Sequence, residues 1–249
     1  YLGRMPGPFS NGALFNKVVH PISQGLGSLV DLFLPRLCAG CDAALMSHEK
    51  ALCLSCTEDL PLTRFHNDPT NPVERVFWGK LELEAATALL HFDKGGMVQH
   101  MLHRLKYKGD KEIGLELGRH MAKALMDSPR FGSVDLLLAV PLHPRKERQR
   151  GYNQSQVLVD GMTEIWGLPP AQQRLMRVVR TPSQTRKGRM DRWLNVKEAF
   201  DLSDAAALEG RHVLLVDDVV TTGATLEGCA RALQKVKGVR VSVVTVAFA

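Results

Sequence analysis

Hydrophobic positions divide the second half of the chain into alternating strands and helices. Mostly apolar runs without alternation predict buried strands at residues 134–140, 213–216 and 239–248. The segments at 153–166 and 226–237 carry apolar side chains at helical spacing instead. Because strands that are apolar throughout are typical of parallel sheets covered on both faces, the pattern predicts an α/β fold, a parallel sheet flanked by helices.

The pattern before residue 134 is less regular. Residues 1–20 are rich in Gly, Pro, Ser and Asn and predict a tail. Apolar positions from Ile22 to Phe33 predict a short helix that docks on its own domain or on a membrane surface, and the prolines and asparagines at 63–80 predict a linker. The other elements predicted here are a strand at 81–92 and helices at 97–106 and 111–126. No run of about 18 apolar residues without charge occurs, so the sequence predicts no membrane span.

The stretch from Val213 to Thr225 places polar residues where a predicted strand ends and a predicted helix begins. Two carboxylates follow the strand, and a loop of small residues with three hydroxyls leads to a helix from about Leu226. Free backbone N–H groups and the positive helix end make such a loop an anion site, and a glycine lets a ligand approach the backbone. Adjacent carboxylates repel a bare phosphate, so the stretch favours a ligand that joins a phosphate to neutral hydroxyls, such as ribose 5-phosphate. The alternative is an ordinary strand-to-helix turn in which Asp and Thr act as caps.

These thirteen residues resemble the signature with which type I phosphoribosyltransferases bind 5-phosphoribosyl-1-pyrophosphate (PRPP): an apolar run, two acids and then Thr-Thr-Gly-x-Thr. The resemblance implies that the acids hold the ribose hydroxyls and the loop holds the 5-phosphate, with Mg²⁺ carried mostly by oxygens of the ligand. The predicted PRPP-binding residues are Asp217, Asp218, Val220, Thr221, Thr222, Gly223, Ala224 and Thr225. Regulators share this fold, so the resemblance predicts a ligand class rather than catalysis, and no catalytic residue is assigned.

Four cysteines form two C-x-x-C pairs separated by eleven residues, Cys38, Cys41, Cys53 and Cys56. Two pairs of thiolates on tight turns can complete the tetrahedral coordination of one structural Zn²⁺, and the spacing is close to that of zinc ribbons. Disulfides need an oxidising compartment, whereas no secretion signal is recognised, and a redox C-x-x-C is not normally doubled. The sequence therefore predicts a zinc finger, in a cytoplasmic protein.

The net charge is +6, the pI is near 9.2, and the cations gather in two stretches. The first follows the first predicted core strand, where α/β sheets bind ligands, and Pro141, Pro144 and Gly151 argue against a helical run there. The predicted pyrophosphate or anion ligands are Arg145, Lys146, Arg148, Arg150, Arg186 and Lys187. A solvated basic surface would explain the same residues, as would single-stranded DNA binding with Tyr152 and Trp193 stacking on bases.

Together these features look like the ComF/GntX family of competence-related, phosphoribosyltransferase-like proteins, over about residues 30–249. The motifs are the four-cysteine segment, Leu-Lys-Tyr-Lys-Gly-Asp at 105–110, Val-Pro-Leu-His-Pro at 140–144, Arg-Gly-Tyr-Asn-Gln at 150–154, and an Arg-x-x-x-Thr-x-x-Gln run from Arg177 to Gln184. Arg180 lies directly before Thr181 and competes with Arg177 for the role of the arginine. The resemblance implies a link to the uptake or use of DNA, with no acceptor base assigned.

The predicted segments are a tail and short helix at 1–34, the zinc finger at 35–62, a linker with a hood-like strand and helices at 63–133, and the phosphoribosyltransferase-like core at 134–249. Two functions are open. The first is an enzyme that transfers the phosphoribosyl group of PRPP, with Mg²⁺, to an unidentified acceptor. The second is a non-catalytic protein that senses PRPP, or that binds single-stranded DNA or a DNA-handling partner. The oligomeric state is open in both.

Overall fold

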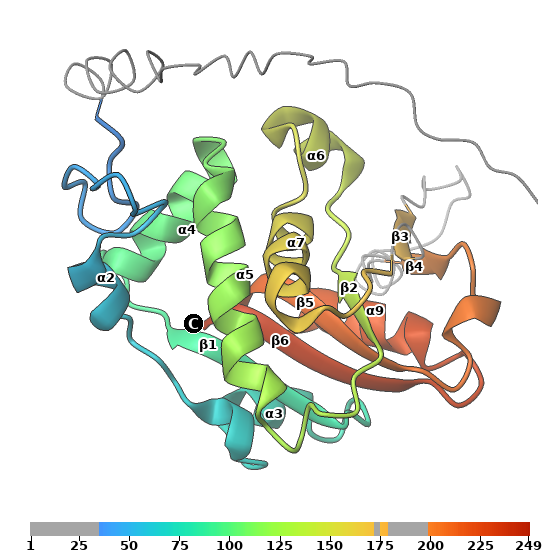
Figure 1. The fold of residues 1–249 in the computed structure, drawn as a ribbon. Helices are drawn as coiled ribbons and strands as arrows, with labels where there is room; N and C mark the ends of the chain where they lie inside the picture. The colour runs from blue at the N-terminus through green and yellow to red at the C-terminus, as the bar shows by residue number, and fades with distance from the viewer. Residues whose placement is uncertain (1–34, 172–174, 179–198) are drawn as a thin grey trace, which may run out of the picture. The chain divides into compact units, whose positions relative to one another are not determined.

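The main sheet of the protein has four parallel strands. The computed structural model describes residues 35–171, 175–178 and 199–249. The strands lie in the order β1 (Ala85–His91), β6 (Arg240–Phe248), β5 (His212–Val220) and β2 (Leu136–Ala139). Leu215 of β5 pairs with Val243 of β6 on one side and with Leu138 of β2 on the other. The α/β class and the parallel sheet predicted from the sequence are confirmed (Figure 1).

Helices cover both faces of this sheet, and the side chains of β5 show how. Leu214 and Val216 belong to the apolar layer under α4, α5 and α7, whereas Val213 and Leu215 belong to the layer under α3 and α9. All four side chains are fully buried, because neighbouring residues of a strand point to opposite faces and both faces are covered. The helices are α3 (Pro72–Phe77), α4 (Met97–Tyr107), α5 (Lys111–Met126), α7 (Gln154–Trp166) and α9 (Ala224–Leu233).

Smaller elements complete the described part of the chain. They are α2 (Leu54–Glu58), α6 (Pro144–Arg150), the 3-10 helices η1 (Phe65–Asn67) and η2 (Ala206–Leu208), and an antiparallel pair of strands, β3 (Leu175–Val178) and β4 (Ala199–Leu202). The pattern of the sequence did not predict this pair. Among the helices of the described residues, none combines the length and the hydropathy that a membrane span needs.

Three elements of the predicted core have boundaries that differ by two residues or more from the predicted ones. β5 continues to Val220, so Asp217 and Asp218 lie within the strand rather than after it, and Asp217 still pairs with a residue of β6. α9 begins earlier than predicted, after Gly223, and ends at Leu233 rather than near residue 237. β2 is shorter than the apolar run, because the N–H of Val134 donates to a turn instead of the sheet.

The segment at 63–80 holds η1 and α3, so the prediction of a linker is wrong. Asn71 caps α3, its Oδ1 accepting hydrogen bonds from the N–H groups of Val73 (2.9 Å) and Glu74 (3.2 Å), and Pro72 takes the first helical position. The Nδ2 of the fully buried Asn71 donates to the carbonyl of Ala86 in β1 at 2.9 Å. The Asn-Pro pair, which indicates a turn when it stands alone, here begins a helix that is fixed to the sheet.

The first basic stretch is helical, which corrects the argument that its prolines and glycine exclude a helix. Pro144 lies in the first turn of α6, where its missing N–H costs nothing, and the Nδ1 of His143 accepts a hydrogen bond from the N–H of Arg145 at 3.1 Å. Gly151 ends the helix with φ +81°. Proline and glycine therefore mark the two ends of this helix.

Three predicted features lie outside the described residues: the tail at 1–20, the helix at 22–33, and the second basic stretch with Arg186 and Lys187. Strand β1, predicted as part of a hood-like segment, forms an edge of the main sheet next to β6. The sheet therefore begins upstream of residue 134, where the core was predicted to start.

Candidate functional site

The turn between β5 and α9, residues 221–225, lies at the N-terminus of a helix and is called the cradle below. Gly223 adopts φ +74° and caps α9, while the side chains of Thr221 and Thr222 are exposed. A Cβ on Gly223 would lie 2.6 Å from Cγ1 of Val76 and 2.8 Å from Cε1 of Phe77, both in α3. Glycine is therefore required twice, by the left-handed backbone and by the close approach of α3. The N-terminal N–H groups of an α-helix point along its axis, so those of α9 face this turn, where an anion can bind.

Asp217 is held beside this cradle by two hydrogen bonds. Its Oδ1 accepts from the hydroxyl of Ser155, the second residue of α7, and from the N–H of Asp218, both at 2.9 Å. Burial first, and the neighbouring charge of Asp218 second, raise the pKa of Asp217 to about 7, although the Ser155 hydrogen bond and the Lys106 ammonium act in the opposite direction. This carboxyl group is therefore partly protonated near neutral pH, which lowers the negative charge of the acidic pair.

Asp218 forms an ion pair with a lysine from a distant part of the chain. The Nζ of Lys106, near the C-terminus of α4, lies 2.9 Å from its Oδ2, and the two side chains are only 22% and 17% exposed. Lys106 belongs to the Leu-Lys-Tyr-Lys-Gly-Asp motif, for whose residues the sequence predicts no individual role. Neither Lys106 nor Ser155 was predicted as a site residue, because their nearness to the acidic pair arises only from the packing of α4 and α7.

The Arg-Gly-Tyr-Asn-Gln motif connects the end of β2 to the same place. Asn153 caps α7 and its Nδ2 donates to the carbonyl of Val140, the residue after β2, at 3.0 Å. The hydroxyl of Tyr152 donates to the carbonyl of Leu105 in α4. Arg150 donates to Gln154 at 2.7 Å, and its guanidinium lies 5.2 Å from the centre of the Tyr107 ring. Two motifs that are far apart in the sequence thus contact each other. The first contains Lys106, and Ser155, which donates to Asp217, directly follows the second.

The predicted anion ligands on α6 differ in their surroundings. Arg145, Lys146 and Arg148 are exposed, whereas Arg150 is half-buried against α4. Their role toward a pyrophosphate stays a prediction. Of the two arginines that compete for one role, Arg177 lies in β3, with its guanidinium 6.0 Å from the ring of Phe200, and Arg180 is outside the described residues.

The four cysteines of the N-terminal segment meet in one cluster. The Sγ atoms of Cys38, Cys41, Cys53 and Cys56 all lie within 4.8 Å of one another. The N–H groups of Gly40 and Cys53 each donate to the Sγ of Cys38 at 3.3 Å. Burial raises the pKa of the Cys38 thiol, but these donors outweigh burial and lower it to about 7. Four sulfurs, one of them favoured as a thiolate, fit the tetrahedral coordination of a structural zinc ion, so the cluster can bind a metal.

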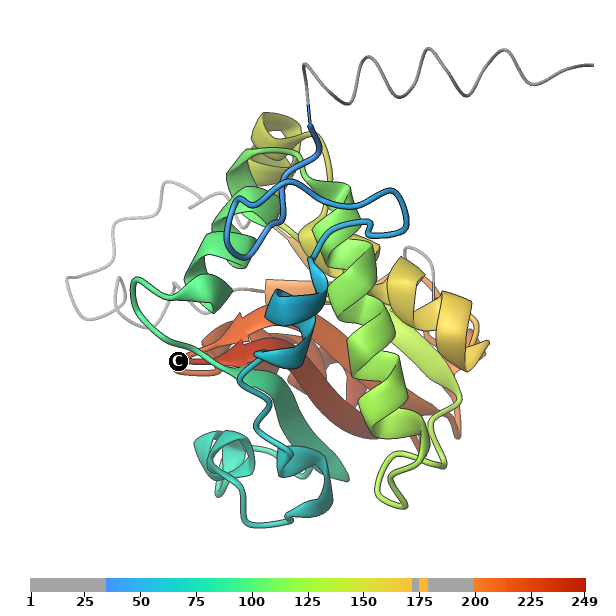
Figure 2. The ribbon, with the colours of Figure 1, turned by 60° about the vertical axis from the view of Figure 1, so that its left-hand side comes forward.

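The cysteine segment packs on α4, which also carries Lys106. The guanidinium of Arg104 donates to the carbonyl of Cys38 (3.0 Å) and to Asp42 (3.3 Å), and it pairs with Asp110 at 2.7 Å. Cys38 and Cys56 belong to the same apolar layer as Met101 and Leu102 of α4. Figures 1 and 2 both show this segment beside α4. The segment is therefore continuous with the core rather than a separate appendage.

The sequence of this chain is similar to one domain family and to several known proteins. A family model with the description "Phosphoribosyl transferase domain" matches residues 114–249 of this chain. A "DNA utilization protein YhgH" from Salmonella typhi is 32% identical over 136 residues, which cover 53% of this chain and 59% of that protein. The protein of the same description from Escherichia coli (strain K12) is 28% identical over 201 residues, covering 79% and 83%. "Competence protein ComFC" of Bacillus subtilis is 32% identical over 151 residues, covering 59% and 58%. The chain thus spans about three fifths of the Salmonella and Bacillus relatives.

Solved structures give a weaker likeness. A glutamine PRPP amidotransferase from B. subtilis matches with a TM-score of 0.36 and 18% identity, over 54% of this chain and 27% of that chain. A hypoxanthine phosphoribosyltransferase from Staphylococcus aureus matches with a TM-score of 0.32 and 15% identity, over 54% and 62%. At these values the likeness says nothing about ligands.

Proposed function

The chain belongs to the family of phosphoribosyl transferase domains, and we propose that it binds PRPP, with Mg²⁺, at the turn between β5 and α9. The observation that carries the proposal is the left-handed Gly223 at the N-terminus of α9, three residues after a strand that carries two carboxylates near its end. The cradle offers backbone N–H groups to a phosphate, and the carboxylates offer acceptors to hydroxyls. Among common metabolites, a ribose 5-phosphate unit carries both groups at neighbouring positions.

The ligand is oriented by the charges around the cradle. The 5-phosphate binds at the positions from Val220 to Thr225, and the ribose hydroxyls bind Asp217 and Asp218. The pyrophosphate faces the cations predicted for it, Arg145, Lys146, Arg148 and Arg150 of α6, with Arg186 and Lys187 of the second basic stretch. Mg²⁺, when bound, adds positive charge to the ligand's oxygens.

The reaction that we propose is transfer of the phosphoribosyl group. A nucleophile of the acceptor attacks the anomeric carbon, the bond from this carbon to the pyrophosphate oxygen breaks, and pyrophosphate leaves with the electron pair. Cationic side chains stabilise the charge that develops on the leaving oxygens. The acceptor is unidentified. Since the relatives are described as DNA utilization and competence proteins, we place the activity in the uptake or use of DNA, in the reducing cytoplasm where thiols persist.

A second candidate is a binding protein without catalysis, and the exposed cations of α6 favour it. Arg145, Lys146 and Arg148 present three positive charges on one short helix, which could contact the backbone of single-stranded DNA while the cradle senses PRPP. Binding of this kind falls steeply as salt rises. A flat response between low and physiological salt would exclude it.

Calorimetry and product analysis test the two candidates in turn. Titration of the protein with PRPP and Mg²⁺ should give heat, and ribose 5-phosphate should compete. Asp218→Asn should weaken PRPP more than inorganic phosphate, because only PRPP presents hydroxyls to this carboxylate. If PRPP gives no heat and ribose 5-phosphate does not compete with it, the proposed ligand is wrong. If it binds, release of pyrophosphate with a panel of nucleobases and nucleophiles separates an enzyme from a sensor.

We also propose that the four cysteines bind one structural Zn²⁺. Four sulfur ligands would close its coordination sphere and leave no position for a substrate. Because the segment from 37 to 62 packs on α4, the ion would stabilise the protein as a whole as well as its own loops. Elemental analysis of protein purified under reducing conditions should find about one zinc per chain, and its absence would overturn the proposal.

A further inference from the structure

Lys106 is held more firmly than an ordinary surface lysine. The preceding Leu105 is fully buried and its carbonyl accepts the hydroxyl of Tyr152. Arg104, one position earlier, is tied to the cysteine segment and to Asp110. Gly109 ends this turn with φ +68°. Fixed backbone on both sides places the ammonium at Asp218, so little conformational entropy is lost when it acts on a ligand there.

The ammonium keeps donors for a ligand. Within the part of the chain that the structure describes, Asp218 is the ion-pair partner of Lys106. An ammonium has three N–H donors, so at least one remains for an oxygen atom on the open side of the site. The Lys106 side chain is 22% exposed, which leaves this side accessible.

The ammonium of Lys106 also balances negative charge in the acidic pair, Asp217 and Asp218. A polyanionic ligand cannot approach two ionised carboxylates without a cost, since like charges a few ångströms apart repel strongly in a partly desolvated site. The hydrogen bond from Ser155 offsets part of the negative charge of Asp217, and the ammonium of Lys106 offsets that of Asp218. A ribose whose hydroxyls contact Asp218 brings the oxygens on its anomeric carbon close to the same ammonium.

We propose that Lys106 is a ligand-binding residue of this site, whose ammonium bridges Asp218 and the pyrophosphate side of PRPP and so distinguishes PRPP from ribose 5-phosphate. This inference rests on the proposed function. It adds a cation from α4 to the predicted cations of α6. Ribose 5-phosphate lacks the pyrophosphate and gains nothing from this contact.

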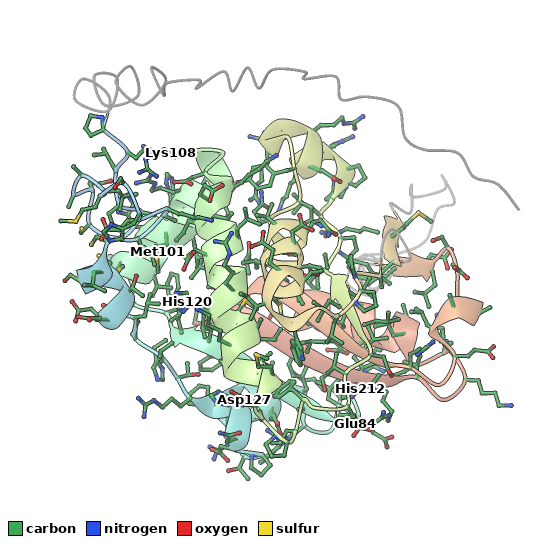
Figure 3. All side chains as sticks on the ribbon, viewed as in Figure 1. Glu84, Met101, Lys108, His120, Asp127 and His212 are labelled. Atoms are coloured by element: carbon green, nitrogen blue, oxygen red, sulfur yellow. The ribbon has the colours of Figure 1, made fainter. Side chains whose placement is uncertain are left out.

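Calorimetry on the full chain tests the inference with two matched lysines. Lys106→Met should weaken Mg²⁺–PRPP about tenfold to a hundredfold, as expected for a hydrogen bond to a charged group, and ribose 5-phosphate by less than about threefold. Lys108, labelled in Figure 3 near the C-terminus of α4, is exposed, and Lys108→Met should change neither affinity. Lys106→Gln repeats the test with a second neutral side chain that can still donate to Asp218, in case the methionine variant does not fold.

A double-mutant cycle separates ligand contact from simple neutralisation of Asp218. If Lys106 contacts the ligand, Lys106→Met should still weaken PRPP in the background of Asp218→Asn. If the loss disappears in that background, or if folded Lys106→Met binds PRPP as well as the wild type, the inference is overturned while the proposed function stands. If the wild type itself binds no PRPP, the proposed function fails first.

Discussion

Gly223 allows the tightest test of the cradle, because two separate costs meet at one position. Alanine at φ +74° pays a backbone cost of about 1–2 kcal/mol. Its Cβ would also lie 2.6 Å from Val76 and 2.8 Å from Phe77, in a side-chain layer where overpacking typically costs about 1–3 kcal/mol. Gly223→Ala should therefore lower the free energy of unfolding by about 2–5 kcal/mol.

A matched glycine isolates the backbone cost. Gly167 caps α7 with φ +71°, and a Cβ there would meet nothing within 4 Å. Gly167→Ala should lose only about 1–2 kcal/mol in urea denaturation, and it should leave phosphate and PRPP binding unchanged. Gly223→Ala should weaken both ligands, because the turn must shift away from α3 to make room.

Two outcomes would contradict the roles given to Gly223, one for its contact with α3 and one for anion binding. If the two alanine variants lose equal stability, the contact with α3 is not tight. If Gly223→Ala is destabilised but binds phosphate as the wild type does, the cradle is structural and the anion site lies elsewhere. The double variant Val76→Ala/Gly223→Ala should recover part of the lost stability, since one of the two close neighbours is then removed.

The remaining predictions concern the cysteines, the acidic pair and α4. Cys53→Ser should abolish zinc in elemental analysis and lower the melting temperature, whereas the buried Cys229→Ser should retain the metal; equal zinc in both would contradict the cluster. Because the folded pKa of Asp217 is raised to about 7, its contribution to stability is present at acid pH and is lost as pH rises toward 7, so Asp217→Asn should flatten the fall in stability between about pH 4 and 7. An unchanged slope would show that another group titrates. Arg104→Ala leaves Asp110 without its 2.7 Å partner and should cost about 2 kcal/mol, against about 0.5 kcal/mol for the exposed Arg231→Ala, as measured by urea denaturation.

The elements that the sequence predicts well are those that local pattern determines. The helix at 111–126 is found at the predicted residues, because apolar spacing and a following Ser-Pro define both its length and its end. The parallel sheet follows from runs that are apolar on both faces. The helices α3 and α6 were missed, because proline was taken as a breaker although it is favoured in the first turn of a helix. In both helices the residue before the proline, Asn71 or His143, caps the helix with its side chain.

The candidate site was predicted only where it is contiguous in the sequence. Asp217 to Thr225 form one stretch, so their spacing alone indicates an anion cradle. Lys106 and Ser155 come from α4 and α7, and no local pattern reveals that these helices bring them to the same carboxylates. The signal that was available is that Lys106 lies in the motif at 105–110 and Ser155 directly follows the motif at 150–154.

Strand β1 has a consequence for how this protein can be divided. The recognisable family segment begins at residue 114, yet β6 is hydrogen-bonded on one side to β1, at 85–91. A fragment cut at the family boundary would turn a central strand, buried along nearly its whole length, into an open apolar edge. Such an edge recruits strands from other chains, so the fragment should aggregate although it contains every residue of the predicted cradle. The unit that similarity recognises is therefore smaller than the unit that can fold.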